Sequence, residues 1–377
     1  MRSSRQSPRN PAAGWRHVDL TLLLATIGVG GMGLLMVYSS TRQKQIAAGL
    51  DPAFFLKRQA LFFVLGVIVL AVATLVDYRH IRDFTPMLYA GAVLILLLVL
   101  SPLGASRRGA QAWFQLGPYQ MEPSELSKLV LVLTLAAFLA SYRGDLDARG
   151  LLLALGLAAV PMGLIFLQPD LGTDMVFVAI LMGVLLVAGA RPRQIAALTL
   201  IALVGIVAVI QLGMLKKYQA DRLSAFLDPQ SDSQQSSYNL RQSQIAIAAG
   251  GVGGRGLFQG TQTNLSFVPE QHTDFIFTAV GEELGFVGGA SLLGLFGVMI
   301  WRTWRAAVLA RDQLGRLICV GVLAMFVFQL FENIGMTMGI TPITGIPLPF
   351  MSYGGSATVA SFVGIGLVLN VNMRRFS

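Results

Sequence analysis

The chain has 377 residues, of which 54% are hydrophobic and only 12% are charged. This balance excludes an ordinary soluble domain and indicates a protein that lies in a lipid bilayer. The net charge of +9 would suit a nucleic-acid-binding protein, but the 28 Lys and Arg residues stand singly or in pairs between apolar runs. We therefore expect them to act as topology signals, with no nucleic acid as a partner.

Apolar runs long enough to cross a membrane recur along the chain. Residues 1–18 are basic and rich in Pro, which predicts a disordered cytoplasmic tail ahead of the first run. Apolar length then predicts spans at residues 19–38, 60–77, 86–102, 125–141, 150–168, 172–189, 194–213, 276–301, 314–340 and 352–373. The sequence therefore predicts an all-α polytopic membrane protein of about ten transmembrane helices, formed by residues 19–375.

The even number of predicted spans places both termini on one side of the membrane. Arg and Lys are concentrated in the short segments on that side, so the positive-inside rule predicts cytoplasmic termini. Residues 214–275, between the seventh and eighth spans, lose the apolar character and are predicted to form a large extracytoplasmic loop. A connection of that length is usually functional.

Two charged residues open the fourth span. Ionisable groups at membrane depth are costly, so each is a candidate functional group, with an internal ion pair as the alternative. Glu125 and Lys128 are three residues apart and share a helical face. Their spacing favours a structural pair and leaves a ligand site as the second interpretation.

A tight turn, Gln168-Pro169-Asp170-Leu-Gly172, separates the fifth and sixth spans. Such a turn exposes backbone N–H groups and one carboxylate at the predicted outer surface. A turn with a capping aspartate explains Asp170 equally well.

His272-Thr273-Asp274 stands directly before the eighth span. An acid at that place can cap the helix, or it can serve as a general base whose pKa depends on its neighbours. His272 has no partners for a zinc site, because the other two histidines, His17 and His80, belong near the opposite face.

The segment from Thr341 to Ser356 contains three prolines and a Gly pair, so it cannot be a continuous helix. Irregular backbone at membrane depth is tolerated where it is buried in protein or lines a cavity. We therefore predict a broken segment packed against the loop that carries Asp274.

Together these motifs resemble the SEDS family (shape, elongation, division and sporulation) from about Asp19 to Arg375. The resemblance rests on the start of the fourth span, the Asp170 turn and the four patterns that follow it. These are Tyr218-Gln-x-x-Arg222 with Phe226-Leu-Asp228-Pro229, Pro269-Glu-Gln-His272-Thr-Asp274-Phe, Gly281-Glu-Glu-Leu-Gly285, and Leu348-Pro-Phe-Met-Ser352-Tyr-Gly-Gly-Ser356. The chain departs from the family at Glu122, where Gln is usual, and at Ala112, where Arg is frequent.

The resemblance implies a peptidoglycan glycosyltransferase, an inverting hexosyltransferase that polymerises lipid II in the bacterial inner (cytoplasmic) membrane. The chain resembles the RodA branch, which acts in elongation and rod-shape maintenance, more than the FtsW division branch. It implies Asp274 as the general base and a class B penicillin-binding protein, a transpeptidase, as partner. Expected substrate-binding residues are Glu125, Lys128, Asp170, Lys217, Arg222 and Ser352. No cofactor is implied with certainty, and a divalent cation at the leaving diphosphate is left open.

Two other functions remain compatible with the sequence. A lipid II flippase would use the same intramembrane charges to line a translocation path. A non-catalytic scaffold would need Asp274 only as a helix cap.

Overall fold

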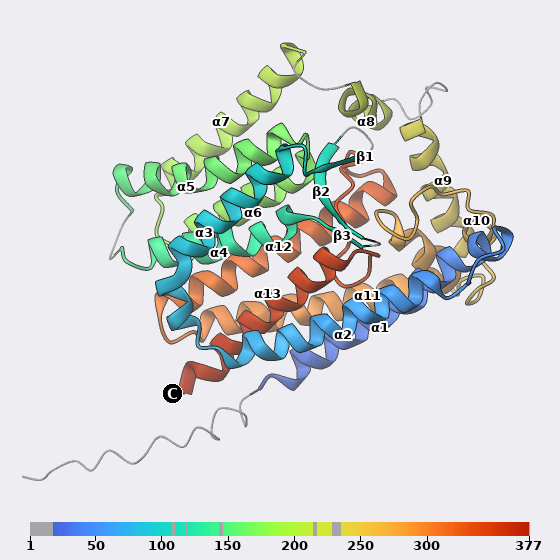
Figure 1. Ribbon diagram of the computed structural model, residues 1–377, viewed down its shortest axis with the longest axis horizontal. Helices are drawn as coiled ribbons and strands as arrows, with labels where there is room; N and C mark the ends of the chain where they lie inside the picture. The colour runs from blue at the N-terminus through green and yellow to red at the C-terminus, as the bar shows by residue number, and fades with distance from the viewer. Residues whose placement is uncertain are drawn as a thin grey trace, which may run out of the picture.

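The computed structural model describes residues 18–107, 110–117, 119–142, 146–213, 217–227 and 235–376. Helices dominate the described chain (Figure 1). The first seven are α1 (Leu20–Ala47), α2 (Phe54–Leu75), α3 (Tyr78–Leu100), α4 (Pro123–Leu139), α5 (Ala148–Leu167), α6 (Leu171–Val187) and α7 (Pro192–Gln211). They are followed by α8 (Lys217–Leu227), α9 (Gln235–Gly250), α10 (Thr261–Asn264), α11 (Ile276–Val308), α12 (Gln313–Met338), α13 (Gly355–Met373) and the 3₁₀ turn η2 (Arg374–Phe376).

Each predicted span corresponds to a helix. Eight described helices are long and apolar enough to cross a membrane, namely α1, α2, α3, α5, α7, α11, α12 and α13. The predicted fourth and sixth spans are α4 and α6, each 17 residues long. This confirms the polytopic helical membrane fold. Several helices exceed their predicted spans, because apolar length marks the part of a helix in lipid and not its polar extension.

The two helices at the centre of the bundle, α12 and α13, are the last two long helices of the chain. Helix α13 packs along α2, and α12 packs against α6, α11 and α4. In contrast, α7 has no buried residue in its apolar window among the described residues. Since helices in lipid gain no hydrophobic free energy by associating, their contacts depend on close backbone approach at small residues.

Two regions differ from the all-helical prediction. Strands β1 (Ala105–Arg107), β2 (Ala110–Leu116) and β3 (Tyr119–Met121) form an antiparallel sheet in the order β1-β2-β3 between α3 and α4. The predicted loop at 214–275 contains helices α8, α9 and α10, and α9 packs on α11 and α12. Apolar length could reveal neither feature, because these segments cover one end of the bundle and do not cross it.

Both ends of the described chain lie at the same end of the bundle. Figure 1 shows the C-terminus opposite to the end where α8, α9 and α10 gather. Asp19, just before α1, pairs with Arg302 near the end of α11 at 2.5 Å, and Arg374 pairs with Asp77 at 3.2 Å. This agrees with an even number of spans. The predicted tail lies outside the described residues, except for Val18.

Candidate active site

Asp274 lies in a turn directly before α11. The backbone N–H groups of Thr273 and Asp274 donate to the Glu270 carbonyl at 3.2 Å, and Phe275 is the N-cap residue of α11. Asp274 is therefore one residue before the cap position. Its side chain is only partly exposed.

Three successive carbonyls of this turn are bound by donors from distant parts of the chain. The His272 carbonyl accepts from the Tyr353 N–H at 2.8 Å, and the Thr273 carbonyl accepts from Ser352 Oγ at 2.5 Å. The Asp274 carbonyl accepts from Asn333 Nδ2 at 2.8 Å. The irregular segment after α12 therefore packs against the Asp274 turn, as the sequence predicted.

Arg222, on α8, approaches the same place as Asp274. Its Nη1 donates to the Thr344 carbonyl at 2.8 Å. A Cβ atom on Gly345 would lie 3.4 Å from Asp274 Oδ2 and 3.6 Å from Arg222 Nη1. Gly345 has φ +83, which favours glycine, and any side chain there would enter the space between the two groups. The Asp274 carboxylate and the Arg222 guanidinium thus lie close together beside Gly345, which has no side chain.

Asp170 belongs to the surroundings of this pair. Its Oδ1 accepts from the Thr173 N–H at 3.0 Å, so it is the N-cap of α6 as one interpretation predicted. The adjacent Pro169 carbonyl accepts from Gln219 Nε2 on α8 at 3.5 Å. A Cβ on Gly172 would lie 3.2 Å from the Thr344 carbonyl oxygen. The α6 turn therefore contacts both α8 and the segment that binds Arg222.

Glu125 and Lys128 form a buried ion pair on α4. Lys128 Nζ lies 2.7 Å from Glu125 Oε1, and the two side chains are only 1% and 4% exposed. A buried pair of this kind avoids an isolated charge in a low-dielectric interior. The structure thus supports the pairing that their spacing predicted.

Glu122 precedes α4 and contacts several polar groups. Its carboxyl oxygens accept from Trp113 Nε1 at 3.2 Å and from Ser124 Oγ at 3.0 Å. Desolvation by the surrounding protein, together with the charges of Glu125 and Asp170, raises the pKa of Glu122 to about 8, while Lys128 and the hydrogen bond from Ser124 act in the opposite direction. The neutral carboxylic acid of Glu122 therefore persists to a higher pH than that of a free glutamate.

Of the remaining predicted residues, Ser352 contacts the backbone of the Asp274 turn, and the side chain of Lys217 is not described. Ser352 is 2% exposed, and its Oγ both donates to the Thr273 carbonyl and accepts from the Leu348 N–H at 2.9 Å. It lies beneath the turn and presents no open surface to a substrate. The side chain of Lys217 lies outside the described residues, as do Asp228 and Pro229.

Two polar residues were not assigned to the site from the sequence. Asn333 is fully buried and binds the Asp274 turn directly. Glu282 accepts bonds from the backbone N–H groups of Gln262 and Thr263 at 2.8 and 2.9 Å. The available signal was their polarity within an apolar run, which marks such residues as candidates without naming their partners.

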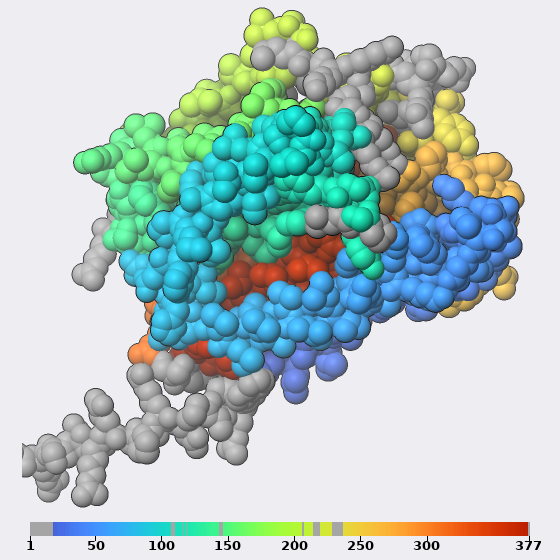
Figure 2. Space-filling model, viewed as in Figure 1, coloured from blue at the N-terminus to red at the C-terminus, as the bar shows by residue number. Residues whose placement is uncertain are grey.

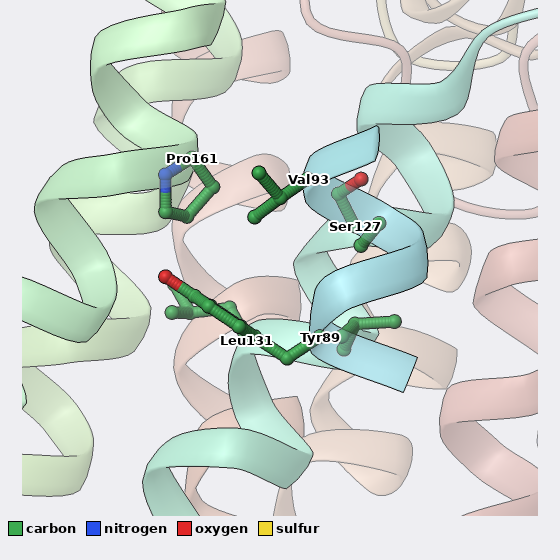
Figure 3. Close-up of a pocket in the computed structure, with 7 residues that line it drawn as sticks. Tyr89, Val93, Ser127, Leu131 and Pro161 are labelled. Carbon is green, nitrogen blue, oxygen red and sulfur yellow. The ribbon is translucent and has the colours of Figure 1, made fainter. Parts of the chain in front are cut away.

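The described residues include no group of three or more His, Cys, Asp or Glu side chains that could hold a metal ion. We derive no step through a cation. A small cavity of about 10 Å³ lies between α3, α4 and α5, lined by residues such as Tyr89, Ser127 and Pro161 (Figure 3). It has room for about one water molecule and contains none of the predicted site residues.

Comparison with known proteins identifies close relatives over nearly the whole chain. The family model FTSW_RODA_SPOVE, described as "Cell cycle protein", matches residues 20–376. The chain is 38% identical to stage V sporulation protein E of Bacillus subtilis over 94% of this chain and 96% of the relative. It is 33% identical to the probable peptidoglycan glycosyltransferase FtsW of Geobacter metallireducens, covering 94% of this chain and 95% of the relative. It is also 33% identical to the peptidoglycan glycosyltransferase MrdB of Escherichia coli K12, covering 95% and 94%.

Solved structures share the fold. One, described as showing the structural coordination of polymerization and crosslinking by a peptidoglycan synthase complex, has a TM-score of 0.81 and 33% identity. The match covers 96% of this chain and all of that one. The rod shape determining protein RodA of Thermus thermophilus has a TM-score of 0.71 and 30% identity, covering 96% of this chain and 99% of that one.

Proposed function

Because this chain belongs to the FtsW, RodA and SpoVE family and is a peptidoglycan glycosyltransferase, we propose that it polymerises lipid II with Asp274 as the general base. We also propose that it belongs to the elongation branch, which maintains rod shape, because the motif around Asp274 is more similar to that branch. The observation that carries the proposal is the convergence of the Asp274 carboxylate and the Arg222 guanidinium beside Gly345.

The proposed reaction joins two lipid-linked disaccharides. The 4-hydroxyl oxygen of one attacks the anomeric carbon of the other, the bond from that carbon to the diphosphate oxygen breaks, and the configuration inverts. The hydroxyl proton passes to the Asp274 carboxylate, and the polyprenyl diphosphate leaves with the bonding electron pair. A neutral hydroxyl is a weak nucleophile, and a placed base contributes about 10²- to 10⁴-fold.

Arg222 is suited to the leaving group. Negative charge grows on the diphosphate as the bond breaks, and a preorganised cation stabilises that charge most in a site with little water. A guanidinium offers five donors in a rigid fork, and the bond from Nη1 to the Thr344 carbonyl at 2.8 Å orients it. We assign Lys217, at the start of the same helix, to the same diphosphate.

The other expected residues take supporting roles in this proposal. We assign Asp170 to sugar hydroxyls; its partial exposure and the contacts of its turn with α8 and the Thr344 segment support this role. The buried pair of Glu125 and Lys128 would bind substrate only after a movement of α4. The burial of Ser352 makes it a support for the turn in place of a substrate contact.

The donor needs a lateral route from the bilayer, since its tail stays in lipid. Figure 2 shows a hollow between α2 and α3, at the bottom of which α13 is visible. We propose this hollow as the place of the lipid tail. The end of the bundle that carries α8, α9 and α10 would then face the outside of the inner membrane, and both termini would face the cytoplasm.

The test is glycan formation from purified lipid II, with and without a class B penicillin-binding protein, since we propose such a transpeptidase as partner. We expect Asp274→Ala and Asp274→Asn to lose at least 100-fold of the native rate, because the attacking hydroxyl keeps its proton. The matched control is Asp51→Asn, which removes an exposed carboxylate paired with Lys57 and should cost little.

Three outcomes would contradict the proposal or a part of it. Full activity of a folded Asp274→Ala variant would show that Asp274 is not the general base. Movement of labelled lipid II across vesicles without any polymer would favour a flippase. Rescue of cell division, and not of rod shape, in cells that lack their own polymerases would assign the chain to the division branch.

A further inference from the structure

Asn333 connects the two halves of the proposed catalytic pair. It lies on α12 with 0% exposure, and its Nδ2 donates both to the Asp274 carbonyl and to the Ile346 carbonyl at 2.8 Å. Ile346 follows Gly345, and Thr344 before it binds Arg222. One amide group therefore joins the backbone that carries the base to the backbone that orients the cation.

The orientation of this amide follows from its surroundings. Exchanging its two ends would place Oδ1 against two carbonyl oxygens, so the assigned orientation is the one with two favourable bonds. Oδ1 itself is buried and has no hydrogen-bond partner among the described residues. A buried acceptor without a partner is unfavourable, and such groups in native structures call for an explanation. We explain the unpaired Oδ1 by the two bonds that Nδ2 makes, because those bonds fix the Asp274 turn.

We propose that Asn333 is a positioning residue that holds the Asp274 carboxylate at its working distance from Arg222. This inference rests on the proposed function, because it assigns to Asn333 the geometry of that reaction. Ser352 and the Tyr353 N–H hold the two preceding carbonyls of the turn. Asn333 alone among these donors also reaches the Gly345 side of the site, through Ile346.

The expected effect is on the chemical step. A displacement of about 1 Å between reacting groups can cost about 10²-fold in rate. We expect Asn333→Leu, which is similar in size but has no donor, to lower kcat by about 10- to 100-fold and to leave KM within about twofold. A residue that served only stability would lower the folded fraction and leave kcat per folded molecule unchanged.

The experiment measures kcat and KM for lipid II polymerisation by the full chain with a class B penicillin-binding protein. The folded fraction is measured by size exclusion. Thr337→Val is the matched control: Thr337 is one turn further along α12, is also fully buried, and its hydroxyl donates to Ile334 within the same helix. We expect the control to keep native kcat. Native kcat in folded Asn333→Leu would overturn the proposal.

A second variant and a double mutant complete the test. Should Asn333→Leu not fold, Asn333→Ser keeps one donor on a shorter side chain that cannot bridge both carbonyls, and the same fall in kcat is expected. Combined with Asp274→Glu, which already displaces the carboxylate, Asn333→Leu should cost less than it does alone; full additivity would contradict the proposal. If Asp274→Asn is active, the assignment of Asp274 as general base is wrong. If Asp274→Asn is inactive but Asn333→Leu keeps the native kcat, only the positioning role of Asn333 is wrong.

Discussion

Glu122 shows how one substitution within a family can keep a local structure. The resemblance implies Gln at this position, a side chain that is neutral at every pH, and the chain has Glu there. Protein burial and the nearby charges of Glu125 and Asp170 raise the pKa of Glu122 to about 8. A neutral carboxylic acid has the shape of the Gln side chain and preserves the contacts to Trp113 and Ser124.

This predicts a pH dependence with a definite sign. A carboxyl group with a folded-state pKa of about 8 and an ordinary value of 4.5 adds stability below pH 4.5 and loses it as pH rises towards 8. The loss is at most about 1.4 kcal/mol per pH unit. We expect Glu122→Gln to gain thermal stability relative to the native chain from pH 5 to 8, with no further gain above 8. A constant difference across that range would contradict the raised pKa.

At the scale of elements, adjacent carboxylates on α11 hold different parts of the predicted outer segment. Glu282 accepts from the N–H groups of Gln262 and Thr263 and from Thr263 Oγ1 at 2.7 Å. Glu283 accepts from Ser39 on α1 and from the Phe258 N–H at 3.1 Å. The Gly-Glu-Glu-Leu-Gly motif therefore joins α10 and α1 to α11.

Hydrogen exchange can separate these two roles. In Glu282→Gln, an amide group faces several donors, so we expect faster exchange at Gln262 and Thr263, with a loss of about 1 to 3 kcal/mol in local opening free energy. Glu283→Gln should instead speed exchange at Phe258. Mass spectrometry of the exchanged peptides measures both variants. The same pattern in both would show that the motif acts as one unit.

At the scale of the molecule, the bundle depends on close contact between α2 and α13. A Cβ on Gly366 would lie 2.8 Å from the Leu70 carbonyl oxygen, so the two backbones nearly touch. On α7, Gly205 has nothing within 4 Å of such a Cβ. The two glycines therefore provide a contrast between the packed centre and a lipid-facing helix.

We expect Gly366→Leu to destabilise the protein by at least about 1 to 3 kcal/mol, because backbone cannot move aside as a flexible side chain can. Gly205→Leu places the same side chain towards lipid and should leave stability nearly unchanged. Thermal unfolding in detergent measures both. Equal effects would mean that α7 is packed against another surface.

Local sequence patterns determined much of this protein. Apolar runs set the helices because each must satisfy its own backbone hydrogen bonds in lipid. The spacing of Glu125 and Lys128 predicted their pair, and the prolines after α12 predicted a broken segment. These features depend on neighbours within a few turns of the chain.

Only the tertiary structure decided how distant residues meet. Arg222, Asp274 and Gly345 come from three separate segments, and Asn333 reaches Asp274 across 59 positions. The same applies to Ser352, whose burial beneath the turn follows from the packing of distant segments. Hydropathy and spacing report a residue's own environment along the chain, whereas a site is made by packing helices that are far apart in sequence.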